Sequence, residues 1–286
     1  MKSGFRMGII LLSFWLLTGC SLITSGFTAG DEGTSTGEKV MKKKEKTAAE
    51  ILEESKQAME KMAGYRWELS GEQRMDIPGE SENGLTAFSG SVDYQESTRY
   101  AADFEVKIEF SNQRHHTMLK MIVDGETAYL QDKARGDWLR KEGSAEEIHS
   151  MMGLEKQYTD AVEVLEMVGA RAKDLSMNQA EGVRRLTLRL ENHDDIQPFM
   201  QYAVDNWRED DKVKAEEVTF SDLELILTID DSTQRLTQIE KNVKVVLPFV
   251  DGVSTDLSQT FTSKMTGEVD EIMIPEEAKN APLVDE

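Results

Sequence analysis

Long stretches of the chain alternate between apolar and polar residues, and this pattern constrains the fold more than any other feature. Beyond Gly64, apolar side chains recur at every second position in Tyr65–Leu69, Phe104–Phe110 and Leu223–Ile229. Successive side chains of a strand point to opposite faces, so this period predicts strands with one buried and one solvated face. Strands of this kind are typical of antiparallel sheets.

The same pattern predicts nine or ten strands in all. Asp124-Gly125 is a hairpin-turn signal between two of them, and a change of phase before Leu223 predicts a bulge near Ser221. The other predicted strands contain Phe88, Val92 and Tyr94; His115 to Val123; Ala128 to Leu130; Trp138 and Leu139; Leu186, Leu188 and Leu190; Ile239, Val243, Val245 and Leu247; Val253, Leu257, Phe261 and Met265; and Ile272 to Ala278, a last short strand that leaves the sheet at Pro275.

Helical spacing of apolar residues predicts three or four helices. The first begins at Thr47, which forms a capping box with Glu50, and ends at Gly64. No segment alternates strand and helix as a βαβ unit would, so we expect an α+β fold: one large curved antiparallel β-sheet, a half-barrel with helices packed on its concave face. The predicted helical faces contain Ile51, Leu52, Ser55, Ala58, Met59 and Met62; a short run from Ser144 through Met151; Ala161, Val162, Leu165 and Val168; and Ile196, Phe199, Met200, Ala203, Val204 and Trp207.

The N-terminus has the pattern of an export signal. Lys2 and Arg6 precede the apolar run Met7–Leu17, which is too short for a comfortable transmembrane helix. The run ends in Leu17-Thr18-Gly19-Cys20, which resembles the bacterial lipobox, in which the cysteine receives the lipid. The alternatives are a signal peptide without lipidation, or an apolar anchor that happens to contain a cysteine.

These features divide the chain into three parts. Residues 1–19 are predicted to be a lipoprotein signal peptide, residues 20–46 the lipidated Cys20 and a flexible tether, and residues 47–286 a single domain. We therefore expect the mature protein to lie on the extracytoplasmic face of the cell membrane, held by its lipid anchor.

Composition excludes several classes of function. The formal net charge of −21 repels nucleic-acid phosphates, which argues against DNA or RNA binding. The single cysteine rules out an intramolecular disulfide, and one cysteine with four histidines makes a structural zinc site improbable. We therefore expect no metal and no cofactor.

No catalytic constellation emerges from the motifs. His115 and His116 are neighbours in a predicted strand, so they point to opposite faces and cannot chelate one ion together. The run His193-Asp194-Asp195 would suit a metal or an acid–base pair, but a solvated turn at a helix start is the better interpretation. No serine has the setting of a nucleophile elbow. The sequence thus predicts a protein that is not an enzyme.

The order of elements resembles a known group of exported proteins. An amphipathic helix ends in Ala58-Met59-Glu60-Lys61-Met62, a strand begins at Tyr65, the hairpin Val123–Leu130 precedes Trp138, and the chain closes on Ile274–Ala278. Over about residues 47–280 this looks like Gram-positive lipoproteins of the LolA/LppX-like (lipoprotein-carrier-like) superfamily. Members have a half-barrel sheet closed by helices, and in some the enclosed space accepts acyl chains, whereas others sense or bind partner proteins.

The leading hypothesis is therefore a membrane-anchored, non-enzymatic binder or carrier of a lipid or an acylated ligand. The alternative is an envelope-sensing or protein-interaction module with a filled core, no ligand and a protein partner still to be identified. Methionine and aromatic side chains suit a pliable lining, although ordinary core packing explains each of them as well. The candidates for contact with a hydrophobic ligand are Met59, Met62, Trp67, Phe104, Trp138, Phe199, Met200 and Trp207.

Overall fold

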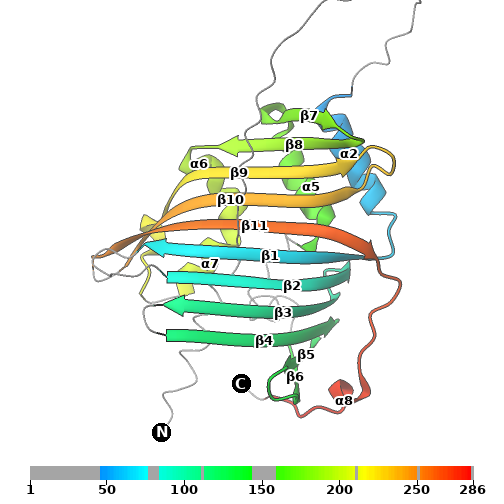
Figure 1. Ribbon diagram of the computed structural model, residues 1–286, viewed down its shortest axis with the longest axis vertical. Coiled ribbons are helices and arrows are strands. Elements are labelled where there is room, and N and C mark those ends of the chain that lie inside the picture. The colour runs from blue at the N-terminus through cyan, green and yellow to red at the C-terminus, as the bar shows by residue number, and fades with distance from the viewer. Residues whose placement is uncertain are drawn as a thin grey trace, which may run out of the picture.

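The computed structural model describes residues 46–76, 84–110, 113–143, 159–209, 212–249 and 252–284 (Figure 1). The predicted signal peptide, Cys20, most of the tether and the helix expected from Ser144 through Met151 lie outside these residues. Within them, no helix is both long and apolar enough to cross a membrane.

The described strands form one antiparallel sheet of 11 strands in the order β6-β5-β4-β3-β2-β1-β11-β10-β9-β8-β7 (Figure 1). Each half is a meander, and the pairing of β1 with β11 joins the two halves. The strands are β1 (Tyr65–Asp76), β2 (Gly84–Glu96), β3 (Arg99–Phe110), β4 (Gln113–Asp124), β5 (Thr127–Asp132), β6 (Trp138–Glu142), β7 (Ser176–Ala180), β8 (Val183–Leu190), β9 (Thr219–Asp230), β10 (Leu236–Pro248) and β11 (Ser254–Glu268).

The two faces of the sheet differ in the way that the alternation predicts. The inner face, which packs against the helices, has buried apolar residues such as Trp67, Leu227 and Phe261. The outer face is mostly polar and has cross-strand ion pairs, among them Arg66–Asp93 at 2.5 Å. Opposite charges on facing strands suit a solvated sheet surface and avoid like-charge repulsion.

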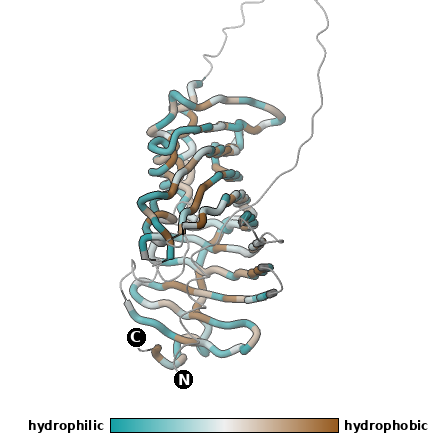
Figure 2. Tube along the Cα trace, turned by 90° about the vertical axis from the view of Figure 1, so that its left-hand side faces the viewer, coloured by the Kyte–Doolittle hydropathy of each residue, from teal (hydrophilic) through white to brown (hydrophobic). Residues whose placement is uncertain are grey.

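The described helices other than α8 cover only part of the inner face. Figure 1 shows α5 and α6 behind strands of the β7–β11 half, and Figure 2, turned by 90°, shows the helices of this half on one side of the sheet. The described helices and helical turns are α2 (Ala48–Met59), α5 (Ala161–Gly169), η2 (Ala172–Asp174), α6 (His193–Ile196), η3 (Gln197–Met200), α7 (Gln201–Glu209), η4 (Ala215–Glu217) and α8 (Glu276–Lys279).

The local sequence explains where helix α2 begins. The capping box of α2 is present, with Thr47 as N-cap and the Glu50 side chain returning to the Thr47 backbone N–H at 2.7 Å. Its apolar face packs Ile51, Leu52 and Met59 into the core. The helix ends at Met59 and a turn follows, so it is shorter than the prediction that ended at Gly64.

The bulge expected near Ser221 is confirmed. Lys244 pairs with Asp222 and Val245 with Phe220, so Ser221 is left without a partner in the ladder. This extra residue returns Phe220 to the inner face, where it stacks on Trp207 with ring centroids 6.2 Å apart.

The expectation for the C-terminal segment is wrong. Residues 269–275 are irregular and Glu276–Lys279 forms the short helix α8, so Ile272 to Ala278 is not a strand. Pro275 lacks an N–H and starts the helix, with Glu276 and Glu277 in the first turn. The segment crosses the outer face of the sheet and buries Ile272 and Ala278 against Ile122 and Trp138.

Candidate hydrophobic site between sheet and helices

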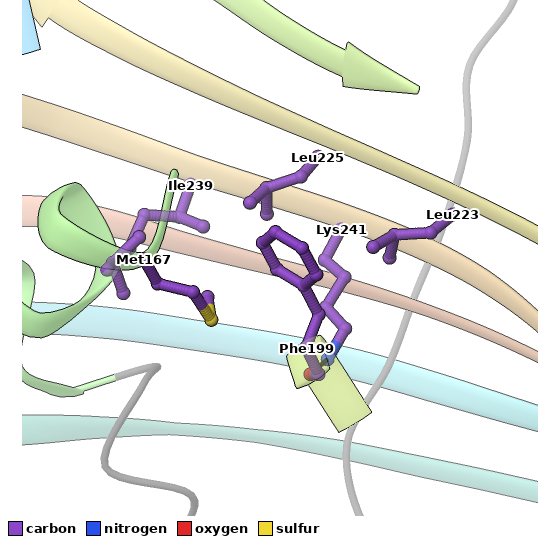
Figure 3. A pocket seen from close by; sticks show the side chains of 7 residues that line it. Met167, Phe199, Leu223, Leu225, Ile239 and Lys241 are labelled. Carbon is purple, nitrogen blue, oxygen red and sulfur yellow. Dashed lines mark hydrogen bonds between the residues drawn. The ribbon is translucent and has the colours of Figure 1, made fainter. Parts of the chain in front are cut away.

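The described helices pack on the inner face across strands β9 and β10. A pocket lies there between α5, η3 and strands β9 and β10, and Figure 3 shows the Phe199 ring beside Leu225 and Lys241. The pocket has room for about one water molecule. An acyl chain therefore does not fit this space as the helices lie. The lining residues are Val164, Met167, Phe199, Leu223, Leu225, Ile239 and Lys241.

Lys241 is a charged residue on this apolar wall. Its side chain is buried, and its Nζ donates to the carbonyl oxygen of Phe199 at 3.4 Å (Figure 3). The sequence analysis did not single out Lys241. A signal for it was present, since Lys241 occupies the inward position between Ile239 and Val243. A cation at such a position costs desolvation energy, so it requires polar partners.

A second polar contact on the inner face joins two central strands. Gln73 of β1 and Gln259 of β11 are both buried, and the Gln259 amide donates to the Gln73 oxygen at 2.9 Å. Polar residues again interrupt a run of inward-facing apolar residues: Gln259 lies between Leu257 and Phe261 on β11.

An aromatic latch holds the start of α5 on the sheet. We use this name for Tyr65, Trp67 and Tyr94 with the helix residues that they bind. The Tyr65 hydroxyl and the Trp67 Nε1 each donate to the carbonyl oxygen of Thr159 at 3.2 Å. The Tyr94 hydroxyl donates to Asp160 at 2.6 Å. Each buried aromatic residue thus packs its ring in the core and pairs its polar tip.

The latch also satisfies the helix terminus. Asp160 is the N-cap of α5 and accepts from the backbone N–H groups of Val162 and Glu163, at 3.0 and 3.2 Å. The Tyr65 oxygen accepts from the Ala161 N–H at 2.9 Å. Burial raises the pKa of both tyrosine hydroxyls, and the hydrogen bond to Asp160 raises that of Tyr94 further.

The inner face continues beyond the helices toward β6. Met121 of β4 pairs with Leu130 of β5, and Leu130 pairs with Leu139 of β6, so the three side chains share this face. Met121 is 1% exposed, Leu130 is half-buried and Leu139 is 44% exposed. Phe104 and Ile108 on β3 are also only partly buried. We call this row of partly covered residues on β3–β6 the open half.

The structure separates the ligand candidates into groups. Met59, Trp67, Phe199, Met200 and Trp207 are all buried in the main core. Met62, in the turn after α2, and Phe104, in the open half, are partly buried against that core. Of these seven residues, only Phe104 therefore lies in the open half.

Trp138 does not lie with the other candidates. It pairs with Gln131 in β5 and its ring lies 5.9 Å from the Lys120 Nζ, both on the outer face. There it packs under the C-terminal segment. The sequence could not fix its face because Trp138 and Leu139 are adjacent apolar residues and show no alternation; only pairing with β5 sets the phase.

His193 and Asp195, which the sequence places in one acidic run, bind different partners. The His193 Nδ1 accepts from the Phe220 N–H at 3.2 Å, and its ring stacks on Phe220. Asp195 instead pairs with Arg171 at 2.7 Å, and this guanidinium lowers the pKa of the carboxyl. Among the described residues, no group of three or more His, Cys, Asp or Glu side chains could hold a metal ion.

Comparison with protein families decides where the chain belongs. The model of a family of unknown function, DUF6612, matches residues 47–282. The chain belongs to the DUF6612 family. The matched region begins at the N-cap of α2 and reaches the C-terminal segment beyond α8. A search of curated proteins found no match.

The solved structures that the comparison matched are distant in sequence. LprF from Mycobacterium bovis is 14% identical, with a TM-score of 0.38, over 81% of this chain and 97% of its own. A lipovitellin structure, titled for its lipid–protein interactions, is 5% identical, with a TM-score of 0.29, over 75% of this chain and 26% of its own. A DUF1329 protein from Desulfovibrio piger is 8% identical, with a TM-score of 0.23, over 74% of this chain and 89% of its own.

Proposed function

We propose that this chain is an extracytoplasmic lipoprotein, anchored to the cell membrane through a lipid on Cys20, which binds or carries a lipid or acyl ligand and catalyses no reaction. The observation that carries the proposal is the open half, where the inner face extends past the described helices and Leu139 is 44% exposed. A contiguous apolar surface of this kind is typical of a binding site.

The open half suits an acyl chain better than a polar ligand. Its partly covered apolar side chains are Phe104, Ile108, Leu119, Leu130 and Leu139. Two charged residues share this face, Asp132 opposite Leu119 and Lys141 opposite Ala128. Each buried CH₂ contributes about 0.8 kcal/mol, so about ten of them would gain about 8 kcal/mol before the entropic costs of binding. Tight binding therefore requires that the protein cover most of the acyl chain.

The experiment uses residues 20–286 with Cys20→Ser, which contains every described residue but cannot be acylated. Native mass spectrometry of the purified protein and titration with a fluorescent fatty acid measure binding. We expect bound lipid and a saturable titration. Leu139→Asp places a charge in the open half and should weaken binding about tenfold, which corresponds to about 1.4 kcal/mol.

Met273→Asp is the matched control, since Met273 is 73% exposed and is not one of the residues of the open half. It should bind the probe as the parent does. A protein that carries no lipid and binds no probe would rule out the proposed ligand class. Equal losses in both variants would show that the open half is not the site.

A second function is favoured by the small volume of the pocket between α5, η3 and strands β9 and β10. Because this pocket has room for about one water molecule, the fold also suits a protein-interaction or envelope-sensing module with a filled core. Crosslinking in intact cells separates the two functions. One recurrent protein partner, without bound lipid in the purified chain, would favour the interaction module.

A further inference from the structure

A lysine stands on the inner face at the margin of the open half. Lys141 of β6 pairs with Ala128 of β5, and Ala128 is fully buried in the main core. Side chains alternate along a strand, so Lys141 points to the same face as Leu139, whereas Arg140 between them points to the outer face. Lys141 is half-buried. A cation therefore adjoins the apolar side chains of the open half.

The Lys141 side chain forms no ion pair and no hydrogen bond within the described part of the chain. Neither carboxylate that flanks β5, Glu126 in the preceding turn or Asp132 at its end, pairs with it. Asp132 accepts from the Ala134 N–H at 2.9 Å instead. It also lies four residues from Ala128 along β5, which is about 13 Å. An ammonium group without a partner, beside an apolar surface, suits an anionic group of a ligand.

The C-terminal segment continues the inner face beyond β6. The Arg140 N–H donates to the Pro282 carbonyl at 3.0 Å, and the Val284 N–H donates to the Arg140 carbonyl at 2.8 Å. These bonds place Leu283 opposite Arg140 in a parallel bridge. Its neighbours Pro282 and Val284 therefore point to the inner face, on the same side as Lys141. Val284 is 42% exposed, so accessible apolar surface lies on both sides of the lysine.

The spacing of the sheet determines which ligands reach from the lysine across the open half. Phe104 lies three strands from Lys141 and four residues further along the strand direction. Neighbouring strands are about 4.8 Å apart and residues about 3.4 Å apart, so the two positions are about 20 Å apart. Leu130 and Leu119 lie between them. Only a long acyl chain spans this distance.

We propose that the ligand of the open half is an anionic amphiphile. Its carboxylate or phosphate pairs with the Lys141 ammonium, and its acyl chain lies over Leu130 and Leu119 toward Phe104. The proposed lipid-binding function is the premise, and the charge and orientation of the ligand are what is added to it. A chain with a net charge of −21 repels anions, so a site for an anionic head group requires a local cation, which Lys141 supplies. The head group stays at the margin of the sheet, which avoids the cost of burying a charge.

The first test compares ligands of equal chain length on the mature chain with Cys20→Ser. Isothermal titration calorimetry measures palmitate against 1-hexadecanol, and a lysophosphatidate with one palmitoyl chain against monopalmitoylglycerol. Each anionic ligand should bind about tenfold more tightly than its neutral partner, because a charge-assisted hydrogen bond is stronger than a neutral one. The tighter of the two anions identifies the head group as a carboxylate or a phosphate. Octanoate is too short to reach Phe104 and should bind at least about tenfold more weakly than palmitate.

Substitution tests the assignment of the charge to Lys141. Lys141→Met keeps an unbranched apolar side chain and removes the cation, so it should weaken palmitate binding about tenfold and leave the affinity for 1-hexadecanol unchanged. Lys141→Arg restores a cation and should keep the preference of the parent. Lys264→Met is the matched control, because it removes one charge from an exposed position on the outer face of β11. It should bind both ligands as the parent does.

Two results would overturn the role of Lys141 and leave the proposed function standing. One is equal affinity of the parent for palmitate and 1-hexadecanol. The other is an equal loss of palmitate binding in Lys141→Met and Lys264→Met. A parent that binds none of these lipids would instead rule out the proposed lipid-binding function, and the anionic ligand with it.

Discussion

At the scale of single residues, the aromatic latch shows how sequence chemistry fixes one helix on the sheet. Tyr65, Trp67 and Tyr94 stand at inward positions of β1 and β2, and the Tyr65 ring lies 5.3 Å from that of Tyr94. Their polar tips lie in the core and therefore need partners, which the Thr159 carbonyl, the Ala161 N–H and the Asp160 carboxylate supply at the start of α5. These contacts satisfy the polar groups of the aromatic side chains and those of the helix terminus together.

The latch predicts a cost for Tyr94→Phe. The variant loses the hydrogen bond to the Asp160 carboxylate, while Asp160 keeps its contacts with the α5 backbone. We expect the free energy of unfolding to fall by about 1.5–3 kcal/mol at pH 7, measured by urea denaturation. Tyr129→Phe, which removes a hydroxyl on the other face of the sheet, should change it by less than about 0.5 kcal/mol.

The raised tyrosine pKa values also predict a dependence on alkaline pH. A tyrosine whose pKa is higher in the folded than in the unfolded state contributes stability that is complete below about pH 10 and is lost as pH rises toward the folded pKa. The stability of the wild-type protein should therefore fall above pH 10, and that of Tyr94→Phe should fall less steeply. Parallel curves for the two proteins would contradict this account.

At the scale of elements, alternation located strands well wherever one face is buried and the other solvated. It missed β7, because an edge strand in which all five residues are exposed has no buried face to alternate with. It also assigned Ile272 and Ala278 to a strand, although they are buried by packing across the outer face of the sheet. Apolar residues in a short segment reveal burial, but they do not reveal which backbone conformation achieves it.

The C-terminal segment should act as one unit that protects the outer face. Ala278 is fully buried beside Trp138, so Ala278→Asp places an unpaired charge there. We expect the segment to detach, with faster amide exchange at Arg140 and Val284, whose N–H groups it pairs, and with unchanged exchange in β9–β11. Glu277→Gln, at an exposed position, is the control, and uniform loss of protection across the whole sheet would contradict a local role.

At the scale of the whole molecule, the predicted anchor and the fold together set how the domain would lie relative to the membrane. A flexible tether of about 25 residues, as the sequence predicts, would span about 25–30 Å on average and would let the domain move over the membrane surface. Figure 1 places α2, where the tether joins, at the opposite end of the long axis from β6 and the exposed Leu139. With the tether extended, the open half would point away from the anchoring membrane.

The anchor itself predicts a simple result. Cys20→Ala removes the acceptor of the lipid, so the chain should no longer incorporate a palmitate label and should leave the membrane fraction. Ser21→Ala preserves the cysteine and is the neighbouring control. Retention of the Cys20→Ala protein at the membrane, with unchanged labelling, would disprove lipidation at this position.

Short-range patterns were enough to predict the strand-rich class, the start of α2 at Thr47, the Asp124-Gly125 turn and the bulge at Ser221, because each depends on neighbours within a few residues. The pairing of β1 with β11 and the outward position of Trp138 emerged only from the folded sheet. Both depend on how one strand pairs with another. A one-residue change of register moves every side chain of a strand to the other face, and local pattern cannot set that register.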